Sequence, residues 1–401
     1  MKADAGRGRA GYFGIALLVG ITPWIAALAP RGAAAVLAVA TLVALGGYVW
    51  HSRRFPQLSQ AILFGWAGAS SLVLASALWC PDIGHGLDFA LKASLTGLQA
   101  MLVYAIARDL PDAGGLDRIL IGAFGGGLAL AFLHTLADGP IYRLLNPGIA
   151  PGDLNTAINR QVVTLSLMAL PAAACLQALI RNTGGWIAAA LLLVATFTVG
   201  MTSFSQSGPA GLLIGVAVVA LTWAAPRTSL WLLALVGIAA ILLMPFGLIA
   251  LSAQDGVRSF DWEEAAVAQR LDIWIAVAHK VMEAPWLGHG IEAARFIEDW
   301  STTTEHVNRT NFHHPHNAAL QIWLEFGALG AGLAALAWAA ICLPLARWTQ
   351  RPQAVAAGTL AATFVVAMIS YGLWQSWWLA VFATLPVIFI FLPGRNPGRA
   401  P

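Results

Sequence analysis

The sequence predicts an all-α, polytopic membrane protein with about twelve transmembrane helices and one large loop on the outer side. Of its 401 residues, 59% are hydrophobic and only 10% are charged, whereas a soluble domain carries about a quarter charged residues. A helix that faces lipid is apolar all round, and about 20 apolar residues span the membrane. The expected spans are residues 11–29, 33–50, 58–79, 87–107, 119–138, 157–180, 185–203, 208–225, 229–251, 316–346, 354–372 and 376–393.

The basic residues predict the orientation, because cytoplasmic loops carry an excess of Lys and Arg. With the N-terminus inside, the short outer loops hold only Arg31 and Arg143. Both termini are therefore expected in the cytoplasm. No small-residue cleavage site follows the first basic residues, so we expect the first span to be retained and not removed as a signal peptide. The inner basic residues are Lys2, Arg7, Arg9, Arg53, Arg54, Arg108, Arg118, Arg181, Arg227, Arg347, Arg351, Arg395 and Arg399.

The three cysteines, Cys80, Cys175 and Cys342, fall at or within separate expected spans. They form neither a metal-binding nor a disulfide pattern, and we interpret them as packed apolar residues. The net charge of +3 is explained by the cytoplasmic loops and does not indicate a nucleic-acid partner.

One connection is much longer than the others and covers residues 252–315. A long loop in a compact domain is usually structured or functional. An amphipathic helix is expected over 261–284, with Asp261 as its cap and Pro285 as its end, and a shorter helix over 291–300. Such a segment is expected to lie on the membrane surface or over a cavity. Because no internal repeat or linker is visible, residues 1–401 are interpreted as a single domain.

Ionisable or polar residues at the membrane edge are costly and are therefore functional candidates. Arg270 lies on the expected loop helix, where it either sits on a solvated face or binds a ligand. Arg160 starts the sixth span and is either an interfacial anchor or a phosphate ligand, because arginine can grip a phosphate with two donors. The candidates are Asp88, Lys92, His134, Arg160, Gln206, Arg270, His289, Arg309, His313, His314, His316 and Glu325.

The stretch "HHPHN" opens the tenth span and is the most polar of these sites. His316 is the candidate general base, because the usual pKa of histidine, about 6.5, suits proton abstraction near neutral pH. His314 is its expected helper across the Pro315 bend. Glu325 lies about 13 Å farther along the helix, so we interpret it as a supporting carboxylate and not a direct partner.

Two other interpretations concern neighbouring residues. The histidines could bind zinc, with His289 or His306 as a further ligand, but the Pro315 bend separates the rings and no cysteine joins them. No Asp-x-Asp pair or glycine-rich phosphate loop is present either, so metal-independent chemistry without a cofactor is expected. Tryptophans in "WQSWW" form either an aromatic belt at the membrane surface or a surface for sugar stacking; they are Trp374, Trp377 and Trp378.

The segment "HNAALQIWLEFGALG" resembles the motif of bacterial O-antigen ligases. That motif has His, then Asn, Ser or Gln, nine residues, Gly, two residues, and Gly, Thr or Tyr, filled here by His316, Asn317, Gly327 and Gly330. The related O-antigen polymerases and O-oligosaccharyltransferases share the wider pattern. The loop helix and its "P.LG.G" turn resemble them as well, in Arg270, Trp274, Pro285, Gly288 and Gly290.

This resemblance implies a glycosyltransferase that moves O-antigen polysaccharide from undecaprenyl diphosphate to lipid A–core at the periplasmic face of the inner membrane. By position, His316 corresponds to the essential histidine of the family, and Arg270 to its loop arginine. Relatives often place another arginine at the outer end of a middle span, where "SFSQSGPAG" has Gly208. Arg160 is the expected substitute, and Asn317, Glu325 and Gln206 are expected to support the site.

The expected reaction is a single displacement that inverts the anomeric carbon. His316 takes the proton of the acceptor hydroxyl, while Arg270 and Arg160 stabilise the diphosphate leaving group. Two alternatives stay open. One is an O-antigen or capsule polymerase with the same chemistry and a lipid-linked acceptor. The other is a polysaccharide-lipid transporter, for which paired charges at mid-membrane and broken helices in matching halves would be expected.

Overall fold

The computed structural model of the chain is an all-α membrane protein, as the sequence predicts. It describes residues 9–29, 32–110, 114–203, 205–253, 265–298, 300 and 312–394, and contains no strand in these ranges. Within them, eleven helices are long and apolar enough to cross a membrane. The run expected at 376–393 forms a shorter apolar helix of 15 residues, Ser376–Ile390.

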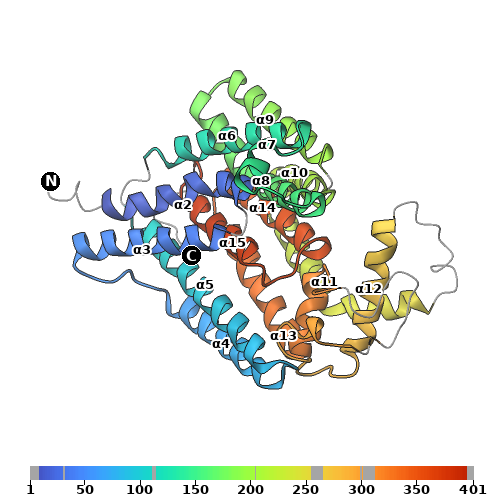
Figure 1. The fold of residues 1–401 in the computed structure, drawn as a ribbon. Coiled ribbons are helices and arrows are strands. Elements are labelled where there is room, and N and C mark those ends of the chain that lie inside the picture. The colour runs from blue at the N-terminus through green and yellow to red at the C-terminus, as the bar shows by residue number, and fades with distance from the viewer. Residues whose placement is uncertain are drawn as a thin grey trace.

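Figure 1 shows the helices as one bundle, in which segments distant in sequence lie side by side. In chain order the elements are α2 (Arg9–Leu28), α3 (Ala33–Ser52), α4 (Gln60–Ser76), η2 (Ala77–Trp79), α5 (Ile83–Asp109), α6 (Leu116–Leu136), α7 (Pro140–Leu145), α8 (Pro151–Ile180), α9 (Thr183–Met201), α10 (Ser207–Ala224), α11 (Pro226–Ser252), α12 (Ala265–Val281), η3 (Ala293–Arg295), α13 (Ala318–Cys342), η4 (Leu343–Arg347), α14 (Gln350–Ile369) and α15 (Ser376–Ile390).

Helix α8 forms the centre of the bundle. It packs against α6, α9, α10 and α14, and its side chains Val163, Leu165 and Met168 belong to the largest core cluster. The hydroxyl groups of Thr164 and Ser166 are buried there, and each donates to the carbonyl four residues earlier in α8, at 2.9 Å. A polar side chain satisfied by its own helix can enter an apolar core without a partner from another segment.

The large outer connection packs against the bundle through α12. Buried Ile273 and Ala278 of α12 lie in the same core cluster as residues of α11 and α13. The expected cap Asp261 lies outside the described residues, as do His306 and Arg309. The expected helix at 291–300 is wrong: only the short turn η3 forms there. Glu292 has φ +58, a left-handed conformation that a right-handed helix cannot continue through.

Helix α13 is broken at Gly327, where φ is +59 and ψ is −154. The turn at 285–290 replaces the helical hydrogen bonds lost there. Backbone N–H groups of His289 and Gly290 donate to the carbonyls of Leu324 and Glu325, at 2.7 and 3.0 Å. A Cβ at Gly327 would lie 2.4 Å from the Trp286 carbonyl carbon. The glycine therefore permits both the conformation and the close backbone contact.

The cysteine interpretation is confirmed, because Cys80, Cys175 and Cys342 are all buried and free. The aromatic-belt interpretation is wrong for Trp377 and Trp378, which are 3% and 0% exposed. A belt residue has to reach the lipid interface, whereas these two rings pack inside the bundle at the start of α15.

Candidate active site

His316 stands immediately before α13 in a constrained backbone conformation. Its φ is +55, which is uncommon for a residue with a Cβ and is found where surrounding contacts impose it. The next residue, Asn317, caps α13: its side-chain oxygen accepts from the Leu320 N–H at 3.0 Å. Asn317 is fully buried, and its amide Nδ2 has no hydrogen-bond partner among the described residues.

The ring of His316 is held by the connection between α14 and α15, residues 370–375. Its Nδ1 lies 2.5 Å from the carbonyl oxygen of Ser370. Because a carbonyl oxygen only accepts, Nδ1 carries the proton and Nε2 keeps its lone pair. Burial lowers the pKa of His316; the bond to Ser370 opposes this effect, and the charge of Arg270 adds to it. The imidazole is therefore neutral near pH 7 and has a basic Nε2.

His314 packs edge-on against His316, with ring centroids 4.2 Å apart. Its ring is confined by Gly372, where a Cβ would approach it to 2.7 Å. Its Nε2 lies 3.1 Å from the side-chain amide nitrogen of Gln375. Burial lowers the pKa of His314 to about 3, and nearby positive charges contribute. His314 therefore stays neutral beside His316, while His313 is exposed.

The two candidate arginines come from elements far apart in sequence and act on the same small group of residues. The guanidinium of Arg160, on α8, lies 5.9 Å from the ring centroid of Trp377. Burial raises the pKa of Tyr371 to about 12, and the charges of both Arg160 and Arg270 oppose that rise. On α12, Trp274 lies one turn after Arg270 and donates to the Pro315 carbonyl at 2.8 Å. This bond fixes the face of α12 that carries Arg270 against the histidine turn.

Hydroxyl groups that the sequence analysis missed complete this region. Ser205 and Ser207 lie 3.1 Å apart, and Ser207 donates to Ser370 at 3.0 Å. This series of hydrogen-bonded hydroxyl groups ends at Ser370, whose carbonyl oxygen holds the ring of His316. The neighbouring Gln206, a predicted supporting residue, is exposed at the start of α10 and makes no capping bond. The repeated serines of "SFSQS" were the available signal, but spacing alone does not show which of them point inward.

Gly208 explains why this segment carries no arginine. A Cβ there would lie 2.9 Å from the Ser166 hydroxyl of α8. A longer side chain at this position would have to displace the central helix. Arg160 lies on the same α8, six residues before Ser166, and approaches the histidines from that helix instead.

Glu325 is fully buried and binds the same connection from below the histidines. One carboxylate oxygen accepts from Gln321 Nε2 at 2.8 Å and the other from Trp374 Nε1 at 2.5 Å. The Gln321 oxygen accepts from the Leu373 N–H at 2.7 Å. Asn317, Gln321 and Glu325 follow at four-residue spacing on one face of α13. The sequence analysis missed Gln321, because a glutamine inside a span does not by itself reveal its partners.

The zinc interpretation finds no support in the described residues, where no three His, Cys, Asp or Glu side chains are placed to hold one metal ion. His289 Nε2 lies 3.0 Å from the Lys280 carbonyl oxygen. His134, another candidate, is buried within the bundle, where its Nδ1 lies 3.2 Å from the side-chain oxygen of Gln161 on α8.

Comparison with known proteins finds a family model that is similar to part of this chain. Residues 188–335 match the family model described as O-Antigen ligase. The matched segment covers less than half of the chain. It contains Arg270, His314, His316, Asn317 and Glu325, whereas Arg160 and the connection at 370–375 lie outside the matched range.

Three Rickettsia proteins, each named "Putative polysaccharide ligase", are similar to parts of this chain. The R. conorii protein is 30% identical over 150 residues, which is 35% of each chain. The R. prowazekii protein is 32% identical over 127 residues, covering 29% of this chain and 30% of its own. The R. felis protein is 31% identical over 128 residues, with the same coverage. The matched part thus covers about a third of these relatives.

Proposed function

We propose that the protein is an O-antigen ligase of the bacterial inner membrane. It transfers O-antigen polysaccharide from undecaprenyl diphosphate to a sugar hydroxyl of lipid A–core, with both termini cytoplasmic and the site periplasmic. The observation that carries this proposal is the bond between His316 Nδ1 and the Ser370 carbonyl. It leaves a basic Nε2 at the start of α13, in the domain that matches the O-antigen ligases.

His316 acts as the general base in this proposal. Its Nε2 takes the proton of the acceptor hydroxyl as that oxygen attacks the anomeric carbon of the donor, and the bond to the diphosphate oxygen breaks. The single displacement inverts the configuration at this carbon. His314, held neutral by burial, packs against His316 and keeps its ring in place.

Arg270 and Arg160 stabilise the leaving group. A diphosphate oxygen departs with negative charge and needs no proton from a general acid, so positive charge directed at it lowers the barrier. The two guanidinium groups approach from α12 and α8, on elements joined to the histidine turn through Trp274 and Trp377. The reaction as proposed uses neither a metal ion nor a cofactor.

Asn317, Glu325 and Gln206 support the site. Asn317 sets the start of α13, because its side-chain oxygen accepts from the Leu320 N–H. Glu325 holds Trp374, and through Gln321 it also holds Leu373, so it fixes the connection that orients both histidines. Exposed Gln206 can contact substrate from the start of α10.

A reconstituted transfer assay tests the proposal. Purified full-length protein in lipid is given undecaprenyl-linked glycan and lipid A–core, with and without chelator, and glycan joined to core is measured. His316→Ala is expected to lower the rate about 10²–10⁴-fold, the contribution of a positioned base. His313→Ala, a change at an exposed neighbour, serves as the matched control and is expected to keep the rate.

Full activity in His316→Ala, with the protein folded, would refute the base assignment. Transfer to a second lipid-linked repeat but not to lipid A–core would replace the ligase with the polymerase. Dependence on added metal would contradict the metal-independent mechanism.

A further inference from the structure

The outer end of α5 carries polar and aromatic residues that the proposed mechanism does not use. His85, Asp88, Phe89 and Lys92 follow at the i, i+3, i+4 and i+7 positions, so they share one face of the helix. We refer to these four residues as the α5 stripe. Asp82 caps the helix just before them, accepting from the His85 N–H at 2.9 Å.

With Asp109 placed at the inner boundary of the membrane, the α5 stripe straddles the outer boundary. Helix α5 has 27 residues. Measured from Asp109, Lys92 lies about 25 Å and His85 about 36 Å along the axis. The hydrocarbon core is about 30 Å thick, so the stripe spans its outer edge. A ligand that meets the stripe at this level is the headgroup of a membrane lipid.

The charged residues of the stripe are exposed. Lys92 Nζ lies 2.5 Å from Asp88 Oδ2, and the two side chains are 68% and 52% exposed. An exposed ion pair at the membrane edge is costly beside lipid tails and is stabilised by polar surroundings. Phe89 lies between charged groups, with Lys92 Nζ and the Arg295 guanidinium each 5.7 Å from its ring centroid.

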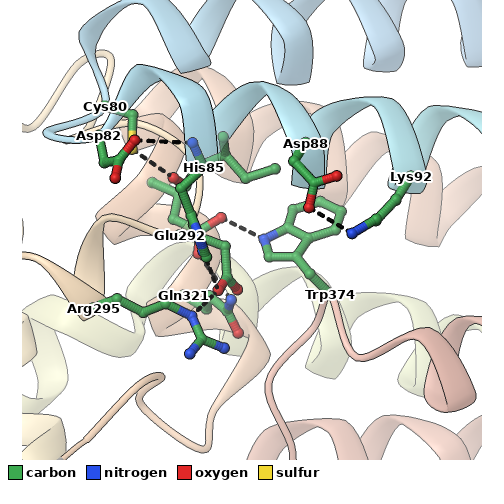
Figure 2. Close-up of polar contacts among 11 residues, drawn as sticks. Cys80, Asp82, His85, Asp88, Lys92, Glu292, Arg295, Gln321 and Trp374 are labelled. Carbon is green, nitrogen blue, oxygen red and sulfur yellow. Dashed lines mark hydrogen bonds and ion pairs between the residues drawn. The ribbon is translucent and has the colours of Figure 1, made fainter. Parts of the chain in front are cut away.

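The turn η3 brings Arg295 to the stripe. Buried Glu292 binds Arg295 Nε through one oxygen, and His85 Nε2 lies 3.8 Å from that oxygen. Figure 2 shows the two terminal nitrogens of Arg295 pointing away from Glu292. Trp374 packs against the same apolar cluster as Phe89 of the stripe. Glu292 has a left-handed backbone conformation, at φ +58, and its carboxylate lies between Arg295 and His85.

The stripe is connected to the candidate active site from the side away from Arg160. Helix α15 packs against both α5 and α8. Beside it, Trp374 donates to Glu325, while Trp377 lies beneath Arg160. The connection at 370–375 that orients the histidines therefore has the diphosphate-binding arginine on one side and the α5 stripe on the other.

We propose that the α5 stripe, with Arg295 and Trp374, binds the sugar headgroup of the acceptor glycolipid. Sugar hydroxyls both donate and accept, which matches neighbouring carboxylate, ammonium and guanidinium groups. The apolar faces of sugar rings pack against an aromatic side chain such as that of Trp374. A diphosphate would favour uncompensated cations, whereas Lys92 and Arg295 are each paired with a carboxylate. The inference rests on the proposed ligase function and adds where the acceptor binds.

The test separates the kinetic constants of the two substrates. Lys92→Met removes a charged donor, and Asp88→Asn removes a negative charge and one acceptor oxygen, each at an exposed position of α5. Arg143→Met is the matched control, because Arg143 forms an equally short exposed pair with Asp138, at 2.5 Å, away from the stripe. Wild type and variants are reconstituted in lipid, and KM is measured for lipid A–core at saturating undecaprenyl-linked glycan, and then the reverse.

Loss of one or two hydrogen bonds to the acceptor is expected to raise its KM about five- to tenfold. The KM of the donor and kcat are expected to change less than twofold, and Arg143→Met is expected to behave as wild type. A raised donor KM would place the donor glycan at the stripe and overturn the proposal, as would unchanged constants in both variants. If wild type transfers nothing to lipid A–core, the proposed function fails and not the acceptor site alone.

Discussion

Helices α8 and α13 both carry polar residues inside the bundle, but they use them differently. On α8, Thr164 and Ser166 bond to carbonyls of their own helix. On α13, Gln321 and Glu325 bond to the connection at 370–375, which belongs to another part of the chain. A polar side chain that bonds to its own helix does not position any other segment. A side chain that bonds to another segment holds that segment in place. The polar face of α13 therefore builds a site, and most of α8 supports it.

Arg160 is the residue by which α8 takes part in the candidate site, and its removal gives the largest effect expected within this comparison. Arg160→Met or Arg270→Met is expected to reduce transfer about 10²–10³-fold, because each removes charge from the leaving diphosphate. Arg→Lys at either position is expected to recover part of the rate, since lysine keeps the charge but loses the two-donor geometry. Transfer rates of the purified variants measure this. A normal rate in Arg160→Met would make α8 purely structural.

The break in α13 gives the next largest effect. Gly327→Ala forces a Cβ into φ +59 and to 2.4 Å from the Trp286 backbone, at a cost of about 3 kcal/mol. Thermal unfolding in lipid is expected to move to lower temperature, and activity to fall as the 285–290 turn leaves the helix. Gly332→Ala is the matched control in the same helix, with open space around it, and gains up to about 1 kcal/mol. Equal melting temperatures for the two variants would contradict the role assigned to the break.

A third pair of variants compares the two kinds of polar bond directly. In Glu325→Gln, one oxygen becomes an N–H donor facing another donor, from Gln321 or Trp374. The mismatch costs about 1–3 kcal/mol, and kcat is expected to fall about tenfold because the histidine-holding connection shifts. Thr164→Val loses only a bond to its own helix and is expected to leave kcat unchanged. A fall in kcat for Thr164→Val and not for Glu325→Gln would reverse the comparison.

The smallest expected effect is a shift in the pH profile. Burial and, secondarily, Arg270 lower the pKa of His316, so the neutral base persists as the pH drops past the usual value of about 6.5. The acid limb of kcat/KM is therefore expected below that pH. Arg270→Gln removes a repelling charge, raises the pKa of His316 and is expected to move the limb of the residual activity upward. Arg270→Lys keeps the charge and is expected to leave the limb in place; an unmoved limb in Arg270→Gln would exclude this coupling.

Much of the architecture could be predicted because lipid imposes a simple rule on sequence. Long apolar runs form spanning helices, and the eleven helices of sufficient length follow the expected runs. The short turn at Glu292 could not be predicted, because its backbone conformation is imposed by partners on other segments. The buried positions of Trp377 and Trp378 were missed for a similar reason. An aromatic residue at a helix end is placed by whichever helices pack around it.

The residues of the candidate site likewise fall into those that the sequence could predict and those that it could not. Local pattern identified His316 and Asn317, since a polar cluster before an apolar run and the spacing to Gly327 are both visible in the sequence. It did not identify Ser370, Gln321 or the hydroxyl chain, because their partners lie far away along the chain.

By itself, the sequence determined that this protein is a helical membrane protein, which polar cluster opens α13, and which family its central segment resembles. The length of an apolar run and the spacing of a motif are local properties of the sequence, so they can be recognised without knowing the fold. Only the tertiary structure decided that Nδ1 of His316 meets a carbonyl, that Arg160 approaches from α8, and that Glu325 binds Trp374. Those facts depend on contacts between segments that are far apart in the sequence, by 54 residues for His316 and Ser370, and only the packing of the helices brings such groups within reach.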